Sequence, residues 1–166
     1  FLVGATNGVT LSSTNGTSWS ASGTKFDGNA VYAAAYGGGT YIIGGATGFL
    51  SNSTDAVTWT ARNPGFGTSD VLAALYAGGK WVVSGVADKI STSTDGATGS
   101  TWSNYAGTFG ASASIRALTY GNSVYVAAGD TAKLYTSATA LSASWTSRTS
   151  GFTADTINGL AYGYVN

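Results

Sequence analysis

Short apolar segments alternate with turns rich in glycine, asparagine and aspartate along the whole chain. Residues 31–62 show the pattern most clearly: they read VYAAAY, the turn GGG, TYIIGG, FLSNS and, after a turn that contains Asp55, VTWTAR. Segments of this length rich in Val, Ile, Tyr and Trp predict antiparallel strands joined by hairpins. No stretch keeps a helical period, and Pro64 lies in a predicted loop. The chain is therefore predicted to be all-β.

This unit of four predicted strands recurs. Four tryptophans are spaced by 40, 43 and 43 residues, and four tyrosines by 40, 44 and 42 residues. The two independent series share a period of about 41 residues, which is the length of a four-stranded β-propeller blade. The series are Trp19, Trp59, Trp102 and Trp145, and Tyr36, Tyr76, Tyr120 and Tyr162.

The two ends of the sequence fit the same repeat. Joined head to tail they read AYGYVNFLVGA, which aligns without a gap to AYGGGTYIIGG at 35–45. We therefore predict one β-propeller domain, residues 1–166, of four four-stranded blades with a split closing blade. The alternatives are that the four repeats belong to a larger propeller or that a partner chain completes the ring. The predicted blades are residues 157–166 plus 1–22, 30–62, 70–104 and 114–148.

Composition removes several function classes. Only 8% of residues are charged, against roughly 25% in an average domain, and 7 basic side chains balance 7 acidic ones, all aspartates. We expect no nucleic-acid partner from a neutral chain, and no run approaches the ~20 apolar residues of a membrane span. Cys, Met and His are absent, so no metal site or cofactor is predicted. Asn15 and Asn52 lie in glycosylation sequons.

Two stretches, YGGGTYIIGGATGFLSNSTDAVTW and YAGGKWVVSGVADKISTSTDGATGSTW, resemble the Asp-box (BNR-type) β-propeller repeats. Such repeats occur in sialidases, photosystem assembly factors, and bacterial and phage surface and tail proteins. The resemblance implies that the acidic or amide residue caps backbone N–H groups of the last hairpin of each blade, and that the tryptophan packs between blades. It implies a folding device rather than a function. The corresponding residues are Asn15, Trp19, Asp55, Trp59, Asp95, Trp102 and Trp145.

Catalysis is not expected. Sialidases of the resembled family use a tyrosine with a glutamate, an acidic proton donor and three converging arginines, but this chain has no glutamate. Its arginines, Arg62, Arg116 and Arg148, fall at different positions of the repeat. A serine hydrolase would need a histidine base or a nucleophile elbow, and neither is present. We predict no catalytic residue.

A third periodic series suggests a binding face. Each loop that precedes a predicted inner strand holds one phenylalanine, with spacings of 40, 43 and 43 residues. We expect these rings to surround one mouth of the propeller and to suit a sugar ring; the alternative is that each phenylalanine anchors its loop between blades. The asymmetric pairs Asp88/Lys89 and Asp130/Lys133 favour the third and fourth blades. The candidate residues are Phe26, Phe66, Phe109, Phe152, Tyr105, Asp70, Asp155 and Arg148, with Lys25 and Asp27 nearby.

These observations predict a non-catalytic recognition or structural module of an extracellular, cell-surface or virion protein, such as an adhesin or a phage tail fibre. Its expected partners are a glycan, a cell-surface receptor or other protomers in a homo-oligomer. The first alternative is a protein-binding propeller similar to an assembly factor. The second is the remnant of a sialidase-like glycosidase.

Overall fold

The structure is a computed structural model that describes residues 1–22, 26, 28–97, 102–105 and 109–163. It confirms the all-β prediction, because its described residues form antiparallel strands and three single-turn 3₁₀ helices. The 3₁₀ helices are η1 (Ala46–Gly48), η2 (Asp130–Ala132) and η3 (Ser142–Ser144).

The strands form four sheets in which each strand pairs with the next along the chain. These sheets correspond to the four sequence repeats. Blade 1 is β1 (Leu2–Gly4), β2 (Thr10–Ser12) and β3 (Ser20–Ala21). Blade 2 is β4 (Val31–Gly37), β5 (Thr40–Gly45), β6 (Leu50–Ser53) and β7 (Thr60–Arg62). Blade 3 is β8 (Val71–Ala77), β9 (Lys80–Gly85), β10 (Ile90–Ser93) and β11 (Ser103–Tyr105). Blade 4 is β12 (Ile115–Gly121), β13 (Val124–Gly129), β14 (Leu134–Ser137) and β15 (Thr146–Ser147).

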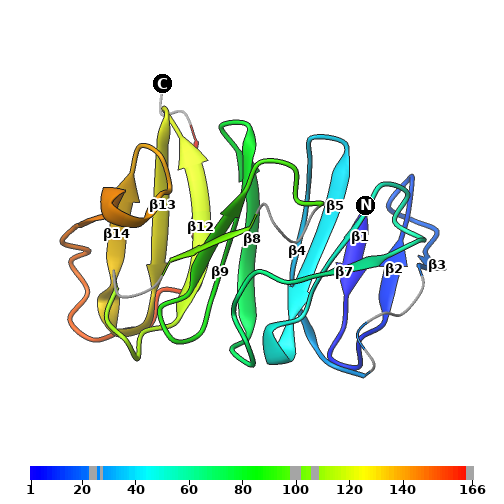
Figure 1. Ribbon diagram of the computed structural model, residues 1–166, viewed down its shortest axis with the longest axis horizontal. Helices are drawn as coiled ribbons and strands as arrows, with labels where there is room; N and C mark the ends of the chain where they lie inside the picture. Colours follow the sequence, from blue (N-terminus) through cyan, green and yellow to red (C-terminus); the bar gives the residue numbers. More distant parts are fainter. Residues whose placement is uncertain (23–25, 27, 98–101, 106–108, 164–166) are drawn as a thin grey trace.

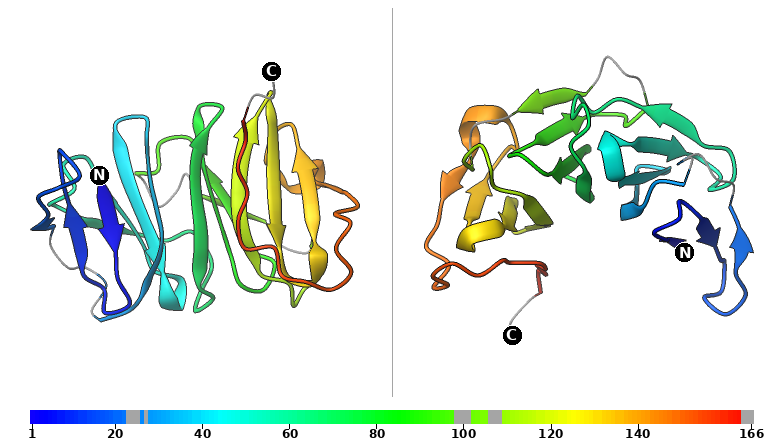
Figure 2. Two further views of the ribbon diagram at one scale, coloured as in Figure 1. Left: turned by 180° about the vertical axis from the view of Figure 1, so that it is seen from behind. Right: turned by 90° about the horizontal axis from the view of Figure 1, so that it is seen from below.

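The blades stand side by side in a curved row, with blade 1 and blade 4 at its two ends (Figure 1). Viewed along the strands, the row is an open arc rather than a closed ring (Figure 2). The inner strands β4, β8 and β12 lie on neighbouring blades and contact one another in sequence. Their exposed side therefore forms a concave surface shared by successive repeats.

The hydrophobic core lies between the blades. Three clusters of buried side chains fill the spaces between blades 1 and 2, 2 and 3, and 3 and 4. Each cluster contains one loop phenylalanine: Phe26, Phe66 or Phe109. Each blade is apolar on both faces, and it buries these faces against the neighbouring blades. This packing of blade on blade stabilises the row.

The predicted closing blade is not formed by this chain. Blade 1 has three strands among the described residues, and residues 157–163 belong to no strand. Instead this segment lies against blade 4, where the N–H of Ile157 donates to the carbonyl oxygen of Gly129 over 3.0 Å. The prediction that it pairs with β1 in the same molecule was wrong, because the arc keeps the two ends far apart (Figure 2).

Candidate functional site

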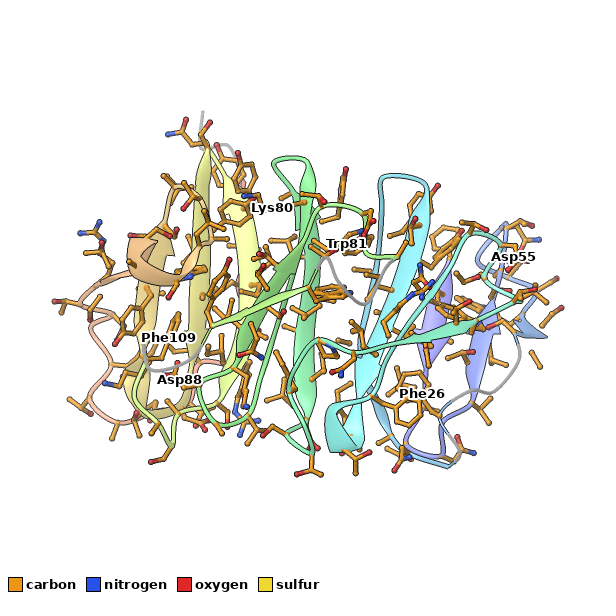
Figure 3. The ribbon with its side chains drawn as sticks, viewed as in Figure 1. Phe26, Asp55, Lys80, Trp81, Asp88 and Phe109 are labelled. Atoms are coloured by element: carbon orange, nitrogen blue, oxygen red, sulfur yellow. The ribbon has the colours of Figure 1, made fainter. Side chains whose placement is uncertain are left out.

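Three of the four loop phenylalanines are not available to a ligand. The side chains of Phe26, Phe66 and Phe109 are 0%, 1% and 2% exposed, whereas Phe152 is 57% exposed. Figure 3 shows Phe26 and Phe109 among packed side chains between sheets. The ring of Phe109 contacts Tyr135 with centroids 4.1 Å apart. The predicted aromatic ring is therefore corrected: the three buried rings anchor their loops, because filling the space between blades hides more apolar surface than a loop face can.

The other candidate residues do not gather around one mouth. Tyr105 is half-buried on β11, opposite Ile90. Arg148 lies exposed near the outer strand β15, where its Nε donates to Thr136 Oγ1 over 2.8 Å. Asp155 is exposed on the segment that follows blade 4. Lys25 and Asp27 lie outside the described residues.

Aspartates at the loop face hold backbone groups. Asp88 is buried, and its two carboxylate oxygens accept from the N–H groups of Phe109 (2.9 Å) and Gly110 (3.2 Å). Figure 3 shows Asp88 and Phe109 close together. Asp70 Oδ1 accepts from the N–H of Thr47 over 2.9 Å. A carboxylate that receives backbone hydrogen bonds stabilises a loop, so these side chains have a structural use.

In the first three blades, the turn before the outermost strand is capped in the manner that the resemblance implies. Asp55 Oδ1 accepts from the N–H groups of Thr58 (2.7 Å) and Val57 (2.8 Å) and from Ser53 Oγ. These hydrogen bonds, that of Thr58 first, hold the pKa of Asp55 well below its ordinary value. Asn15 Oδ1 accepts from two N–H groups of its own turn in the same way.

The third turn repeats this capping, since Asp95 Oδ1 accepts from the N–H of Ala97 over 2.9 Å. The tryptophans of the motif differ in burial. Trp59 is 4% exposed and Trp145 8%, Trp102 is half-buried, and Trp19 is 39% exposed. The motif residues therefore cap turns and pack between blades, and we assign them no role in ligand binding.

A cleft on the concave surface is the strongest candidate site. It has a volume of about 440 Å³ and draws on four successive repeats. Its main residues share one repeat position, the residue that follows the β-branched start of each inner segment, with spacings of 40, 44 and 42. The lining residues are Tyr32, Asp70, Leu72, Val86, Arg116 and Asn158.

A backbone irregularity places these side chains on the concave face. The pairing of β4 with β5 shifts register between Val31 and Ala33, and the same shift occurs at the start of β8 and β12. Tyr32, Leu72 and Arg116 are thus the extra residues of three equivalent β-bulges. Bulges re-aim a side chain and often adjoin functional sites. Here the bulge turns one residue per blade towards the shared cleft.

Among the described residues, Arg116 is the arginine that lines this cleft. Its Nε donates to Asp130 Oδ1 over 2.6 Å, while its side chain stays 39% exposed. Desolvation raises the pKa of Asp130, but the hydrogen bonds from Arg116 and Ser114 outweigh it and the net direction is down. An oriented, partly exposed guanidinium can bind a carboxylate through its remaining N–H groups.

A second depression includes the other member of the ion pair, Asp130. It has a volume of about 510 Å³ and is lined mainly by backbone and small side chains of the loop 109–113, together with Asp130 and Lys133. Arg116 lines the first hollow and Asp130 lines the second, so the ion pair on blade 4 connects residues of both.

Sequence reasoning missed Tyr32, Leu72 and Asn158, and it considered Arg116 only as a catalytic arginine. The signal was present: at this position the four repeats carry Tyr, Leu, Arg and Asn, while the residue before it is Val, Val, Ile and Ile. A position that varies beside one that is always β-branched marks a surface that the packing between repeats does not constrain. The register shift that exposes it could not be read from the sequence.

Metal and membrane features are limited. Within the part of the chain that the structure describes, no group of three or more acidic residues is placed to hold a metal ion. Nor does any helix in that part reach the length and hydrophobicity of a membrane span.

Comparison with solved structures shows the β-propeller fold. The computationally designed Ika8 protein matches 98% of this chain over 49% of its own, with a TM-score of 0.74 and 16% identity. YCF48 bound to D1 peptide matches 90% of this chain over 51% of its own, with a TM-score of 0.66 and 15% identity. The ancestral GH74 enzyme AFV00434 matches 84% over 21%, with a TM-score of 0.67 and 16% identity. The chain thus spans about half or less of each.

No protein-family model matches the chain, and no curated protein matches it. The structural neighbours establish the propeller architecture, and at this identity they establish the fold alone.

Proposed function

We propose that this chain is a non-catalytic recognition module whose concave cleft binds an extended polypeptide segment that carries an acidic group. The observation that carries the proposal is the single variable repeat position at the bulges, which brings Tyr32, Leu72, Arg116 and Asn158 together. Structural demands repeat from blade to blade, whereas a specific ligand does not. Residues that differ at equivalent positions are therefore the ones free to serve a ligand.

The chemistry of the cleft suits a peptide. Arg116 supplies a fixed cation for a carboxylate, and Asn158 supplies an amide that can both donate to and accept from peptide groups. Leu72 offers an apolar contact, and Tyr32 is 48% exposed with a phenol at its tip. The cleft volume lies within the range of about 300–1,000 Å³ that is typical of ligand sites. YCF48, a structural neighbour, has been solved with a peptide bound, which supports this choice of ligand.

Several contacts support a non-catalytic role. Arg62 donates from Nε to Asn52 Oδ1 on the outer part of blade 2, and Arg148 lies on the outer part of blade 4. They cannot join Arg116 around one substrate carboxylate, as the arginines of a sialidase do. Asp55 and Asp88 are engaged by backbone N–H groups. An extracellular, cell-surface or virion location stays part of the proposal, supported by the low charge of the chain.

A glycan is the second candidate ligand. Tyr32 is the observation that favours it, since an exposed aromatic face beside amide and carboxylate groups can stack on a sugar ring. With the phenylalanine rings buried, Tyr32 is the sole aromatic side chain that lines the described cleft. A glycan is thus favoured by one side chain, whereas Leu72, Arg116 and Asn158 all suit a peptide.

The test is an array of synthetic peptides beside a glycan array, probed with the 166-residue chain. Each acidic residue of a bound peptide is replaced in turn by its amide. We expect acidic peptides to bind and Arg116→Gln to weaken them by about ten-fold or more, because a charge-assisted hydrogen bond is lost. Arg148→Gln, which removes the same charge outside the cleft, is the matched control and should bind as the wild type does.

Equal loss in both arginine variants, or binding that ignores the acidic residue, would contradict the proposal. Binding to glycans alone, lost in Tyr32→Ala, would favour the second candidate. Conversion of a bound glycoside to products would overturn the non-catalytic assignment.

A further inference from the structure

Blade 1 has an unpaired strand edge, and the segment after blade 4 belongs to no sheet. β1 pairs with β2 on one side only among the described residues, and residues 157–163 form no strand. An exposed strand edge presents unpaired N–H and C=O groups to any segment that can pair with it. These two features lie at opposite ends of the arc (Figure 2).

The segment after blade 4 already follows the path of an inner strand. The N–H of Ile157 donates to the carbonyl of Gly129 over 3.0 Å, just as the N–H of Val31 donates to the carbonyl of Ala5 over 3.0 Å. Val31 begins the inner strand β4, which lies against blade 1. Ile157 therefore takes the same place against blade 4.

The tyrosine of the segment repeats a second interblade contact. The ring of Tyr162 covers Gly121 at the end of β12, as the ring of Tyr76 covers Gly37 at the end of β4. Neither glycine could carry a side chain without meeting that ring. The segment thus occupies the position of an inner strand. The second strand that would pair with it is not part of this arc.

Blade 1 has a groove where such an inner strand belongs. The groove lies between β1 and β4 and has a volume of about 240 Å³. Its rim is unusually exposed and apolar: Phe1 is 70%, Tyr36 61% and, on the adjoining edge of β1, Val3 42% exposed. The lining residues are Phe1, Leu2, Ala34, Ala35, Tyr36 and Tyr41.

An aromatic pair across the first hairpin marks each complete blade. One ring comes from the inner strand and one from the second strand, with centroids 4.5, 5.1 and 4.5 Å apart in blades 2, 3 and 4. In blade 1 the second-strand position is Phe1, whose ring stands 6.4 Å from Trp19. The matching inner-strand residue in the repeat is Tyr162. The three pairs are Tyr36 with Tyr41, Tyr76 with Trp81, and Tyr120 with Tyr125.

We propose that two copies of this chain close one ring of eight blades head to tail. Residues 157–162 of each copy form the inner strand of blade 1 of the other. The observed register of β4 with β5, in which Ala34 lies opposite Ile43, places Leu160 of one copy opposite Val3 of the other.

The curvature supports a second copy over closure within one chain. The four blades leave the arc open (Figure 2). The arc also superposes on about half of a longer propeller chain, as described above. A second arc of equal curvature supplies the other half, and since the chain has no net charge, no overall repulsion opposes the pairing. The inference goes beyond the proposed ligand and does not depend on it.

The first experiment measures mass in solution. Light scattering after size exclusion of the 166-residue chain should give twice 16.6 kDa, with no larger species. A mass of 16.6 kDa at micromolar concentration, or a ladder of open head-to-tail polymers, would overturn the closed pair.

Cross-linking tests the register. The chain has no cysteine, so the two thiols of a Val3→Cys/Leu160→Cys double variant are the only ones that can form a disulfide. Mild oxidation should give a covalent dimer, whereas Val57→Cys/Leu160→Cys should not. A disulfide within one chain would show that the molecule closes on itself and would overturn the proposal, as would the absence of any cross-link.

An edge charge provides a test that leaves each blade intact. Val3→Lys puts a charge on the exposed edge of β1 and should shift the mass to 16.6 kDa. Val57→Lys makes the same change at a side chain that is 60% exposed in a turn, and the mass should stay doubled. Circular dichroism and melting confirm that both variants fold. A folded Val3→Lys variant that remains a dimer would contradict pairing at β1.

Discussion

Residues at equivalent repeat positions differ in burial and in the hydrogen bonds that they make. Trp59 is nearly buried, and its Nε1 donates to the carbonyl of Ser22 in blade 1 over 2.8 Å. Trp19 is 39% exposed, and its Nε1 donates within its own turn, to Gly16, over 3.2 Å. The sequence showed four tryptophans in register but not which of them join blades. That depends on whether a preceding blade lies beside the ring.

Trp59→Ala should therefore lower the free energy of unfolding by about 3–5 kcal/mol, because it leaves a cavity between blades and removes the hydrogen bond to Ser22. Trp19→Ala, the same change at an exposed ring, should cost far less. Urea denaturation followed by circular dichroism measures both. Equal costs would show that the packing between blades 1 and 2 is misassigned.

The capped turn of blade 2 predicts an acid dependence. The folded-state pKa of Asp55 is lowered by the backbone hydrogen bonds, so the unfolded chain takes up the proton more readily. The contribution of Asp55 to stability is present above its ordinary pKa of 3.8 and is lost as the pH falls below it.

Asp55→Asn should flatten the fall of melting temperature below about pH 4, because an amide still accepts the N–H groups, as Asn15 does, but does not titrate. Asp155→Asn removes the same charge from an exposed side chain and shows the effect of net charge alone. A profile for Asp55→Asn as steep as the wild type below that pH would contradict the role assigned to the carboxylate.

At the scale of elements, the strands were predicted well and the loops less well. The segments 31–36 and 40–45 became β4 (Val31–Gly37) and β5 (Thr40–Gly45). The predicted fourth strand, 57–62, shortened to β7 (Thr60–Arg62), because the turn capped by Asp55 extends to Thr58. Alternation predicts strands because it reports local geometry. It does not report whether a loop side chain turns outward or into the space between sheets.

The loop phenylalanines test this distinction. Phe66→Ala should cost about 3–5 kcal/mol of unfolding free energy, because a ring that is 1% exposed leaves a cavity among the residues between blades 2 and 3. Phe152→Ala, at the equivalent repeat position but 57% exposed, should unfold within about 1 kcal/mol of the wild type. A Phe66→Ala protein as stable as the wild type would contradict the assignment of Phe66 as a buried loop anchor.

At the scale of the molecule, a repeat period gives the length of a blade but not the angle between blades. That angle follows from the volumes of the side chains packed between sheets, such as Phe66 and Trp81. Head-to-tail continuity of the sequence was therefore compatible with closure by one chain or by two. The open arc, the three described strands of the first blade and the docked segment after blade 4 argue against closure by a single copy.

The four blades of one chain form an open arc with a shared concave cleft rather than a closed ring. Electron cryo-microscopy of the purified chain, with particles viewed along the channel axis, tests it most directly by counting the blades around each ring. We expect rings of eight blades with Tyr32 and Arg116 of each copy facing the channel. Closed rings of four blades, each built from one chain, would contradict it.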